Sequence, residues 1–234
     1  MIFIALTGCF AYNLMNVGDV AAATSGSGTD IQPEDPRAGG DGALMFKHEY
    51  EVLNGQTTPD GEHIYKEVIV PSGIPIVYMD DEDAKVLLTS GSGALFMGFP
   101  ECPWCRTLLP ALVSAYEKSD YTGVIYYYNA LEDRDALSLS EDGEIVVEAE
   151  GAPVYHDLVA ILYDYLMPYS GLGDESIRRI YLPTTVFVKN GDISSVHLTT
   201  IESQESGYDV LTDEQFAELE GILIEKFNAI SDSA

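Results

Sequence analysis

The decisive stretch is Phe99-Pro100-Glu101-Cys102-Pro103-Trp104-Cys105-Arg106, which stands between an apolar run and a helical pattern. The run, residues 94–99, is short and bulky, as expected of a buried strand. Beyond it, apolar side chains recur at the spacing of one helix face, at Leu108, Leu109, Leu112, Val113 and Tyr116. The stretch therefore predicts a strand, a turn that carries two cysteines, and a helix.

Cys102 is predicted to be the N-cap of this helix, because Pro103 suits the first helical position, where no backbone N–H is needed. Unpaired backbone N–H groups and the positive end of the helix dipole favour a thiolate at that place. The thiol pKa is lowered as a result, and we expect Cys102 to be the nucleophile. Cys105 is placed to attack a mixed disulfide formed on Cys102. The predicted chemistry is thiol–disulfide exchange.

Other interpretations of the cysteine pair stay open at this point. A structural zinc site needs four ligands, and the only other cysteine in the chain is Cys9. A structural disulfide between Cys102 and Cys105 would close a short loop and add some stability. A carrier of a soft metal ion would use the two thiolates as ligands. The sequence favours redox activity, with no metal ion and no cofactor.

A second stretch, residues 180–192, reads as a strand that is entered through Pro183 and left through an Asn-Gly hairpin turn. Together with the strand, cysteine pair and helix before it, this stretch resembles the thioredoxin superfamily. The resemblance implies an α/β thioredoxin-like fold with a central mixed sheet flanked by helices. It also implies that Pro183 is cis and lies beside the cysteines, and that Leu182 offers backbone groups to an extended substrate. The alternative is a trans proline that opens an edge strand.

The resemblance covers roughly residues 85–230, and the chain departs from the family at two places. Many thioredoxins carry a buried acid six residues before the first cysteine, where this chain has Phe96, so a proton-relay carboxylate is absent from that strand. The residues between the cysteines are Pro103 and Trp104, which leaves open whether the protein reduces, oxidises or isomerises disulfides. Both residues are predicted to contact substrate, Trp104 through an apolar face; the alternative for Trp104 is packing into the domain.

The charge of the chain is strongly one-sided. Its 234 residues include 39 acidic and 11 basic side chains, for a net charge of −28. Such a surface repels nucleic acid and anionic lipid, so we exclude nucleic-acid binding. We attribute the acidity to solubility or to a salty or surface environment. Binding of divalent cations stays open, although no calcium-binding loop of the Asp/Asn/Gly kind is present.

Residues 1–9 form an apolar segment that is too short to span a bilayer and ends Leu6-Thr7-Gly8-Cys9. This ending resembles the lipobox of bacterial lipoproteins, which implies cleavage before Cys9 and a diacylglyceryl anchor on its thiol. No Lys or Arg precedes Arg37, so either the start is truncated or the segment is a short apolar tail. Residues 10–42 are rich in small and polar residues and are predicted to be a flexible linker.

Residues 43–234 are predicted to form the thioredoxin-like domain, with an N-terminal strand extension and an insertion at about 130–152 before the Pro183 strand. Strands are expected at 48–53, 63–70, 76–79, 124–129, 144–148 and 193–200. Helices are expected after the acidic residues 80–83, over 155–167, and after Thr212.

The sequence thus predicts a bacterial lipoprotein-type thiol–disulfide oxidoreductase that works outside the cytoplasm and touches the membrane only through its lipid anchor. Its partners would be protein thiols and disulfides and an unidentified redox partner. The alternative is a thioredoxin-like binding or accessory module whose Cys102–Cys105 disulfide is structural. Turnover separates the two, because an enzyme must cycle between dithiol and disulfide.

Overall fold

A computed structural model describes residues 41–232 of the chain. The predicted lipoprotein segment 1–9, with Cys9, and the predicted linker as far as residue 40 lie outside the described residues. The first helix, α1 (Asp41–Glu51), begins inside the last two positions of that predicted linker. No helix within the described part has the length and apolar character that crossing a membrane requires.

The core is an open, mixed sheet of five strands in the order β1-β3-β2-β6-β7. Its strands are β1 (Ile76–Tyr78), β2 (Gly93–Met97), β3 (Ile125–Tyr128), β6 (Thr184–Lys189) and β7 (Asp192–Leu198). The first three are parallel to one another, whereas β6 runs antiparallel to β2 and β7 antiparallel to β6. The predicted fold class is confirmed: this is an α/β fold with a mixed sheet flanked by helices, consistent with a thioredoxin-like fold.

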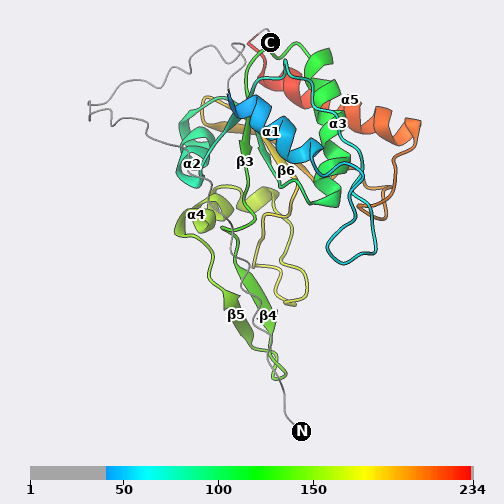
Figure 1. Ribbon diagram of the computed structural model, residues 1–234. Coiled ribbons are helices and arrows are strands. Elements are labelled where there is room, and N and C mark those ends of the chain that lie inside the picture. The colour runs from blue at the N-terminus through cyan, green and yellow to red at the C-terminus, as the bar shows by residue number, and fades with distance from the viewer. Residues whose placement is uncertain (1–40, 233–234) are drawn as a thin grey trace, which may run out of the picture. The chain divides into compact units, whose positions relative to one another are not determined.

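Helices cover both faces of the sheet (Figure 1). On one face lie α1, α3 (Pro103–Lys118) and α5 (Asp213–Ile230), where Phe46 of α1 packs on Phe96 and Phe227 of α5 packs on Phe187. On the other face, α2 (Asp81–Ser90) and α4 (Pro153–Ile161) contact each other. The side chain of Arg106 and both cysteines belong to the α1/α3 side.

Strand β2 and helix α3 form as the sequence predicts. All five residues of β2 are buried, and α3 begins at Pro103. The predicted apolar face of α3 is buried at Leu108, Leu109, Leu112 and Val113, and Tyr116 is partly buried. Because β2 is the middle strand, the turn that follows it lies at the centre of the sheet, at the carboxyl end of β2. The cysteine pair therefore follows the central, fully buried strand of the sheet.

The strand predicted at 48–53 is wrong, because those residues belong mostly to helix α1. Its buried residues, Ala43, Phe46 and Tyr50, are three and four positions apart, which is helical spacing. Phe46 and Tyr50 pack against Tyr127 of β3, with ring centroids 4.8 and 6.3 Å away. Polar and apolar residues alternate over 48–53 alone, whereas the apolar residues of the longer segment 41–51 have helical spacing.

The strand predicted at 63–70 is also wrong: this segment is extended but joins no sheet, apart from an isolated bridge between Thr57 and Ile64. In its first half the segment bonds to the backbone of residues 55–58, and in its second half side chains take the place of a neighbouring strand. The Asn54 amide exchanges two hydrogen bonds with the backbone of Val68, at 2.8 and 3.0 Å. The Glu51 carboxylate accepts the Val70 N–H at 2.8 Å. The predicted N-terminal strand extension is thus a helix followed by an extended segment, and only β1 is a strand.

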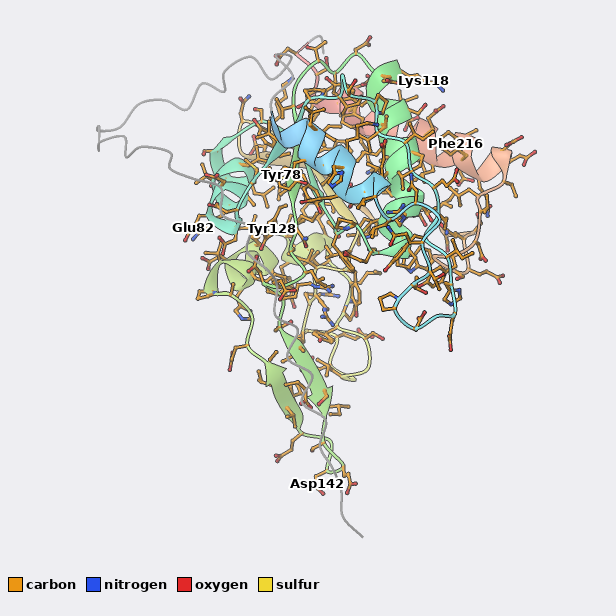
Figure 2. All side chains as sticks on the ribbon, in the orientation of Figure 1. Tyr78, Glu82, Lys118, Tyr128, Asp142 and Phe216 are labelled. Carbon is orange, nitrogen blue, oxygen red and sulfur yellow. The ribbon has the colours of Figure 1, made fainter. Side chains whose placement is uncertain are left out.

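The insertion forms a separate hairpin of β4 (Ala136–Leu139) and β5 (Ile145–Ala149), which includes the extra strand predicted there. Every residue of β5 is exposed. In Figure 2, Tyr128 marks the end of the main sheet and Asp142 the far tip of the hairpin. Helix α4 ends at Ile161, earlier than the predicted 167, and a short 3-10 helix (Tyr163–Tyr165) follows it.

The remaining elements agree with the sequence. Asp80 is the N-cap of α2 and accepts the Asp83 N–H at 2.8 Å. Thr212 and Gln215 form a capping box at the start of α5. Asn190 and Gly191 have positive φ angles of 54° and 78°, as the hairpin turn between β6 and β7 requires.

Candidate active site

Cys102 is the N-cap of α3, and Pro103 occupies the first turn, as predicted. The Cys102 Sγ accepts a hydrogen bond from the backbone N–H of Cys105 at 3.1 Å. On its other side it donates to the carbonyl of Leu182 at 3.6 Å. The sulfur therefore lies between a helix N-terminus and the residue that precedes Pro183, two segments 80 positions apart in the sequence.

The two thiols differ in acidity in the predicted direction. The pKa of Cys102 is lowered from its ordinary value, first by a hydrogen bond from Cys105 and then by the backbone N–H groups of Cys105 and Trp104 and the charge of Arg134, while burial opposes them. The pKa of Cys105 is raised well above its ordinary value, first by burial and then by Cys102. Cys102 is 3% exposed and Cys105 is not exposed, so the difference in access between them is small.

Close packing fixes the Cys105 side of the pair. A Cβ added to Gly98 would lie 2.8 Å from the Phe96 ring and 3.1 Å from the Cys105 Sγ, so this position has room for glycine only. Phe96, six residues before Cys102, is 1% exposed and packs on Tyr127 and Phe46. The Phe96 ring therefore occupies the position at which many thioredoxins carry a buried carboxylate.

The Leu182–Pro183 bond is cis, as predicted. Leu182 is 8% exposed, and Pro183 is buried next to Thr184, the first residue of β6. Thr184 pairs with Met97, the last residue of β2, so the chain reaches the start of β6 at the end of the strand that leads to Cys102. The pairing of the two strands explains why residues so distant in sequence meet at one sulfur.

Trp104 is half-buried, and its indole packs on the connection between β7 and α5. A Cβ added to Gly207 in that connection would lie 2.9 Å from the indole ring. The packing that was the alternative for Trp104 thus accounts for one side of its ring. Pro103 is partly exposed at the start of α3. A contact of either residue with a substrate stays a prediction.

Arg106 is a structural residue of this site that the sequence did not reveal. It follows Cys105 directly and is only 1% exposed. Its guanidinium donates to the carbonyls of Tyr50, Pro100 and Lys66 at 2.6–3.1 Å and to the Asn54 side-chain oxygen. It therefore ties α3 to the end of α1 and to the extended segment 63–70. Nothing in the sequence separates this buried arginine from a solvated one.

Two further arginines near the cysteines, Arg134 and Arg179, were also not predicted from the sequence. Arg134 follows β3, and Arg179 precedes the cis peptide bond; the charge of Arg134 lowers the pKa of both cysteines. Arg179 donates to the carbonyl of Asp135 at 3.2 Å and lies 4.4 Å from the centroid of the Tyr169 ring. Arg134, which lies within the insertion, thus brings a positive charge towards the thiols.

His48 is exposed, and His63 is partly buried and stacks on Tyr208 with ring centroids 3.7 Å apart. Within residues 41–232, no three His, Cys, Asp or Glu side chains gather into a group that could hold a metal ion.

No known family model matches this chain, and no curated protein is significantly similar to it in sequence.

Proposed function

We propose that this chain is a member of the thioredoxin superfamily that exchanges disulfides with other proteins outside the cytoplasm. The observation that carries the proposal is the environment of Cys102 Sγ, which accepts the Cys105 N–H at 3.1 Å and lies 3.6 Å from the Leu182 carbonyl. The Cys105 N–H and the helix N-terminus stabilise a thiolate at this sulfur, and Cys105 supplies a second thiol within reach.

The reaction is written here in the direction that reduces a substrate. The Cys102 thiolate attacks one sulfur of a substrate disulfide, the S–S bond breaks, and the second sulfur leaves as a thiolate that takes a proton from solvent. Cys105 gives its proton to solvent and attacks Cys102 Sγ, which breaks the mixed disulfide and releases the first substrate sulfur. Two electrons pass from the dithiol to the substrate, and an external dithiol restores the pair. The reverse steps oxidise a substrate dithiol.

The opposite pKa shifts support this division of roles. Cys102 is the thiol whose pKa is lowered, so it supplies the attacking thiolate. The charge of Cys102 is one of the causes that raise the pKa of Cys105. When Cys102 is bound in a mixed disulfide that charge is lost, so the pKa of Cys105 falls at the step in which Cys105 must ionise.

Turnover of a peptide with one internal disulfide tests the proposal. With dithiothreitol as the reductant, the full chain should accelerate its reduction, and Cys102→Ser should abolish the acceleration. The Cys105→Ser variant should form one mixed disulfide per chain and then react no further, because it lacks the resolving thiol. A native chain that forms no mixed disulfide and gives no turnover would instead be a binding module.

Alkylation of the thiols as a function of pH tests their assignment separately. The faster thiol should titrate below the ordinary value of about 8.5 for cysteine and should be absent from Cys102→Ser. Mass spectrometry of the labelled peptides identifies the residue. Faster labelling of Cys105 would reverse the two roles.

We also propose that the mature chain is held at the outer face of a bacterial membrane by a lipid on Cys9. The support is the sequence Leu6-Thr7-Gly8-Cys9 followed by residues 10–40, which are rich in Gly, Ser, Ala and Asp. Labelling cells with a fatty acid, with the native upstream sequence in place, should mark the chain and not its Cys9→Ala variant. Equal release of both forms into the soluble fraction would end this proposal.

A further inference from the structure

Arginines are concentrated around the insertion. The chain has five arginines, and three of them, Arg134, Arg178 and Arg179, lie in the segments on either side of the β4–β5 hairpin. Acidic residues flank these arginines in the sequence, yet none of the three forms an ion pair with a carboxylate among the described residues, and that lack of pairing needs an explanation. The position of two of these residues relative to Cys102 supplies one.

Arg179 is connected to the thiol by a short series of contacts. Its guanidinium lies 4.4 Å from the ring centroid of Tyr169 and 5.9 Å from that of Tyr181. Tyr181 directly precedes Leu182, whose carbonyl lies 3.6 Å from Cys102 Sγ. Aromatic rings on this side orient the guanidinium without neutralising its charge.

Arg134 stands next to Arg179 and has no ion-pair partner among residues 41–232. The Arg179 side chain donates to the carbonyl of Asp135, the residue after Arg134, at 3.2 Å. The Arg134 Nε is buried and has no hydrogen-bond partner within the described part of the chain, and the same holds for the Nε atoms of Arg178 and Arg179. The pKa of Arg134 is lowered, first by burial and then by the charge of Arg179. Two partly buried cations that repel each other are stabilised by an anion between or beside them.

The acidic residues nearby do not supply that anion. Among residues 41–232, the ion pairs are Lys47–Glu51, Lys85–Asp157 and Lys118–Glu220, so neither arginine pairs with a carboxylate. Asp133 accepts a hydrogen bond from the Tyr128 hydroxyl at 2.6 Å. Asp135 has a buried oxygen, Oδ1, without a partner. A carboxylate from another molecule would accept from the donor that Arg134 leaves unpaired.

We propose that Arg134 and Arg179 form a subsite for a carboxylate that lies beside the reacting cysteine of a polypeptide substrate. This inference rests on the proposed function and assigns to it a substrate class: proteins with Asp or Glu next to the cysteine that is exchanged. Arg134 brings its charge to both the carboxylate and Cys102, whereas Arg179 is held in place by Tyr169 and the Asp135 carbonyl.

The net charge of the chain does not prevent this recognition. Repulsion between separated surface charges is largely screened beyond about 8 Å at physiological ionic strength. A carboxylate in contact with a guanidinium in a partly dehydrated site is screened much less. The acidic surface slows the approach of an acidic substrate, and the arginine pair selects it after contact.

The experiment compares two peptides that differ only in charge. Each has one cysteine linked to thiopyridine as a mixed disulfide, with Glu on both sides of the cysteine in one peptide and Gln in the other. Attack by Cys102 joins the peptide sulfur to Cys102 and releases thiopyridine, whose absorbance gives the rate. With the full, reduced chain, the Glu peptide should react about tenfold faster, the value expected for about 1.4 kcal/mol from a charge-assisted hydrogen bond.

Variants of the arginines locate the source of this preference. Arg134→Gln should slow both peptides, because Cys102 loses a stabilising charge, and should also bring the rate ratio close to one. Arg134→Lys should retain part of the ratio, since it keeps the charge. Arg178→Gln is the matched control and should leave the ratio unchanged, because Arg178 lies over Tyr163, with its guanidinium 5.3 Å from the ring centroid.

The outcomes separate this inference from the proposed function. A ratio near one in the native chain, or an unchanged ratio in Arg134→Gln, overturns the carboxylate subsite while leaving disulfide exchange intact. A chain that reacts with neither peptide overturns both. A mixed disulfide of thiopyridine with mercaptopropionate, which has a carboxylate but no peptide, should react more slowly than the Glu peptide; a faster reaction would assign the subsite to small acids and overturn the polypeptide assignment.

Discussion

Arg106 and Arg134 both belong to the surroundings of the cysteine pair, but they are held in opposite ways. Arg106 is 1% exposed and makes five hydrogen bonds, one for each N–H of its guanidinium. Arg134 is partly exposed, and its buried Nε has no partner among residues 41–232. All the donors of Arg106 are satisfied within the fold, whereas Arg134 has donors left for a ligand.

The difference shows how one residue type serves two purposes. Carbonyl oxygens surround Arg106, so its burial costs less than that of an unpaired cation, and it fixes three chain segments around the start of α3. The region of Arg134 is formed by loops at the base of an exposed hairpin. Stability therefore depends on the first arginine and substrate choice on the second.

The largest expected effect is that of Arg106→Met, which should destabilise the protein by about 3–5 kcal/mol. Methionine fills much of the volume, but it leaves the carbonyls of Tyr50, Pro100 and Lys66 without their buried donor. Urea denaturation followed by circular dichroism measures the free energy of unfolding. Arg106→Lys should lose less, because the ammonium group restores some of the donors.

A loss below about 1 kcal/mol for Arg106→Met would contradict the assignment of Arg106 as the buried tie between α1, the extended segment and α3. The matched control is Thr107→Val, at the next position of the same helix. Its hydroxyl donates to the Pro103 carbonyl within α3 at 3.0 Å and to the Gly207 carbonyl at 3.3 Å, and it accepts from the Lys66 ammonium group, which makes three contacts against the five of Arg106. The control should therefore cost less than Arg106→Met.

The sequence predicted the parts of the fold whose signals are local. Pro103 after Cys102 specified the start of α3, and the Asn190-Gly191 pair specified the turn after β6. The second half of the segment 63–70 could not be predicted, because the backbone partners of Val68 and Val70 are the Asn54 and Glu51 side chains. Those contacts depend on the position of α1, which was itself assigned to a strand.

For the candidate site, the sequence identified the residues whose positions follow from the helix start and from strand pairing. Cys102, Cys105 and Pro183 meet as expected, since β6 pairs with β2 beside the cysteine turn. The roles of Arg106 and Arg134 depend on burial and on which donors find acceptors, and residue type does not reveal either property. Charge alone would have placed both side chains in solvent.

His197 extends the comparison, since it is nearly as buried as Arg106 and its Nε2 is unpaired within the described residues, like the Nε of Arg134. Burial first, and then the charge of Lys226, lowers the pKa of His197 to about 4, from the ordinary value of 6.5. Between these values the unfolded chain binds a proton that the folded chain does not, so the free energy of unfolding falls as the pH is lowered. The loss reaches about 3 kcal/mol.

His197→Leu should remove this part of the acid sensitivity. Urea denaturation of the native chain and the variant at several values between pH 6.5 and pH 4 gives the difference between the two stability curves, which should widen in favour of the variant as the pH falls. The exposed His48 provides the control: His48→Gln should follow the native curve. Parallel curves for the native chain and His197→Leu would show that His197 binds protons equally in both states.

The smallest expected effect on stability is that of Arg134→Gln, within about 0.5 kcal/mol of the native chain. The substitution removes no hydrogen bond among the described residues and relieves the repulsion from Arg179, so the fold loses nothing that it uses. The same change should raise the pKa of Cys102, because the charge of Arg134 is one of the causes that lower it. Denaturation and the pH dependence of alkylation measure the two quantities on one variant. A large loss of stability, or an unchanged Cys102 titration, would place Arg134 with Arg106 as a residue of the fold, and the contrast between the two arginines would disappear.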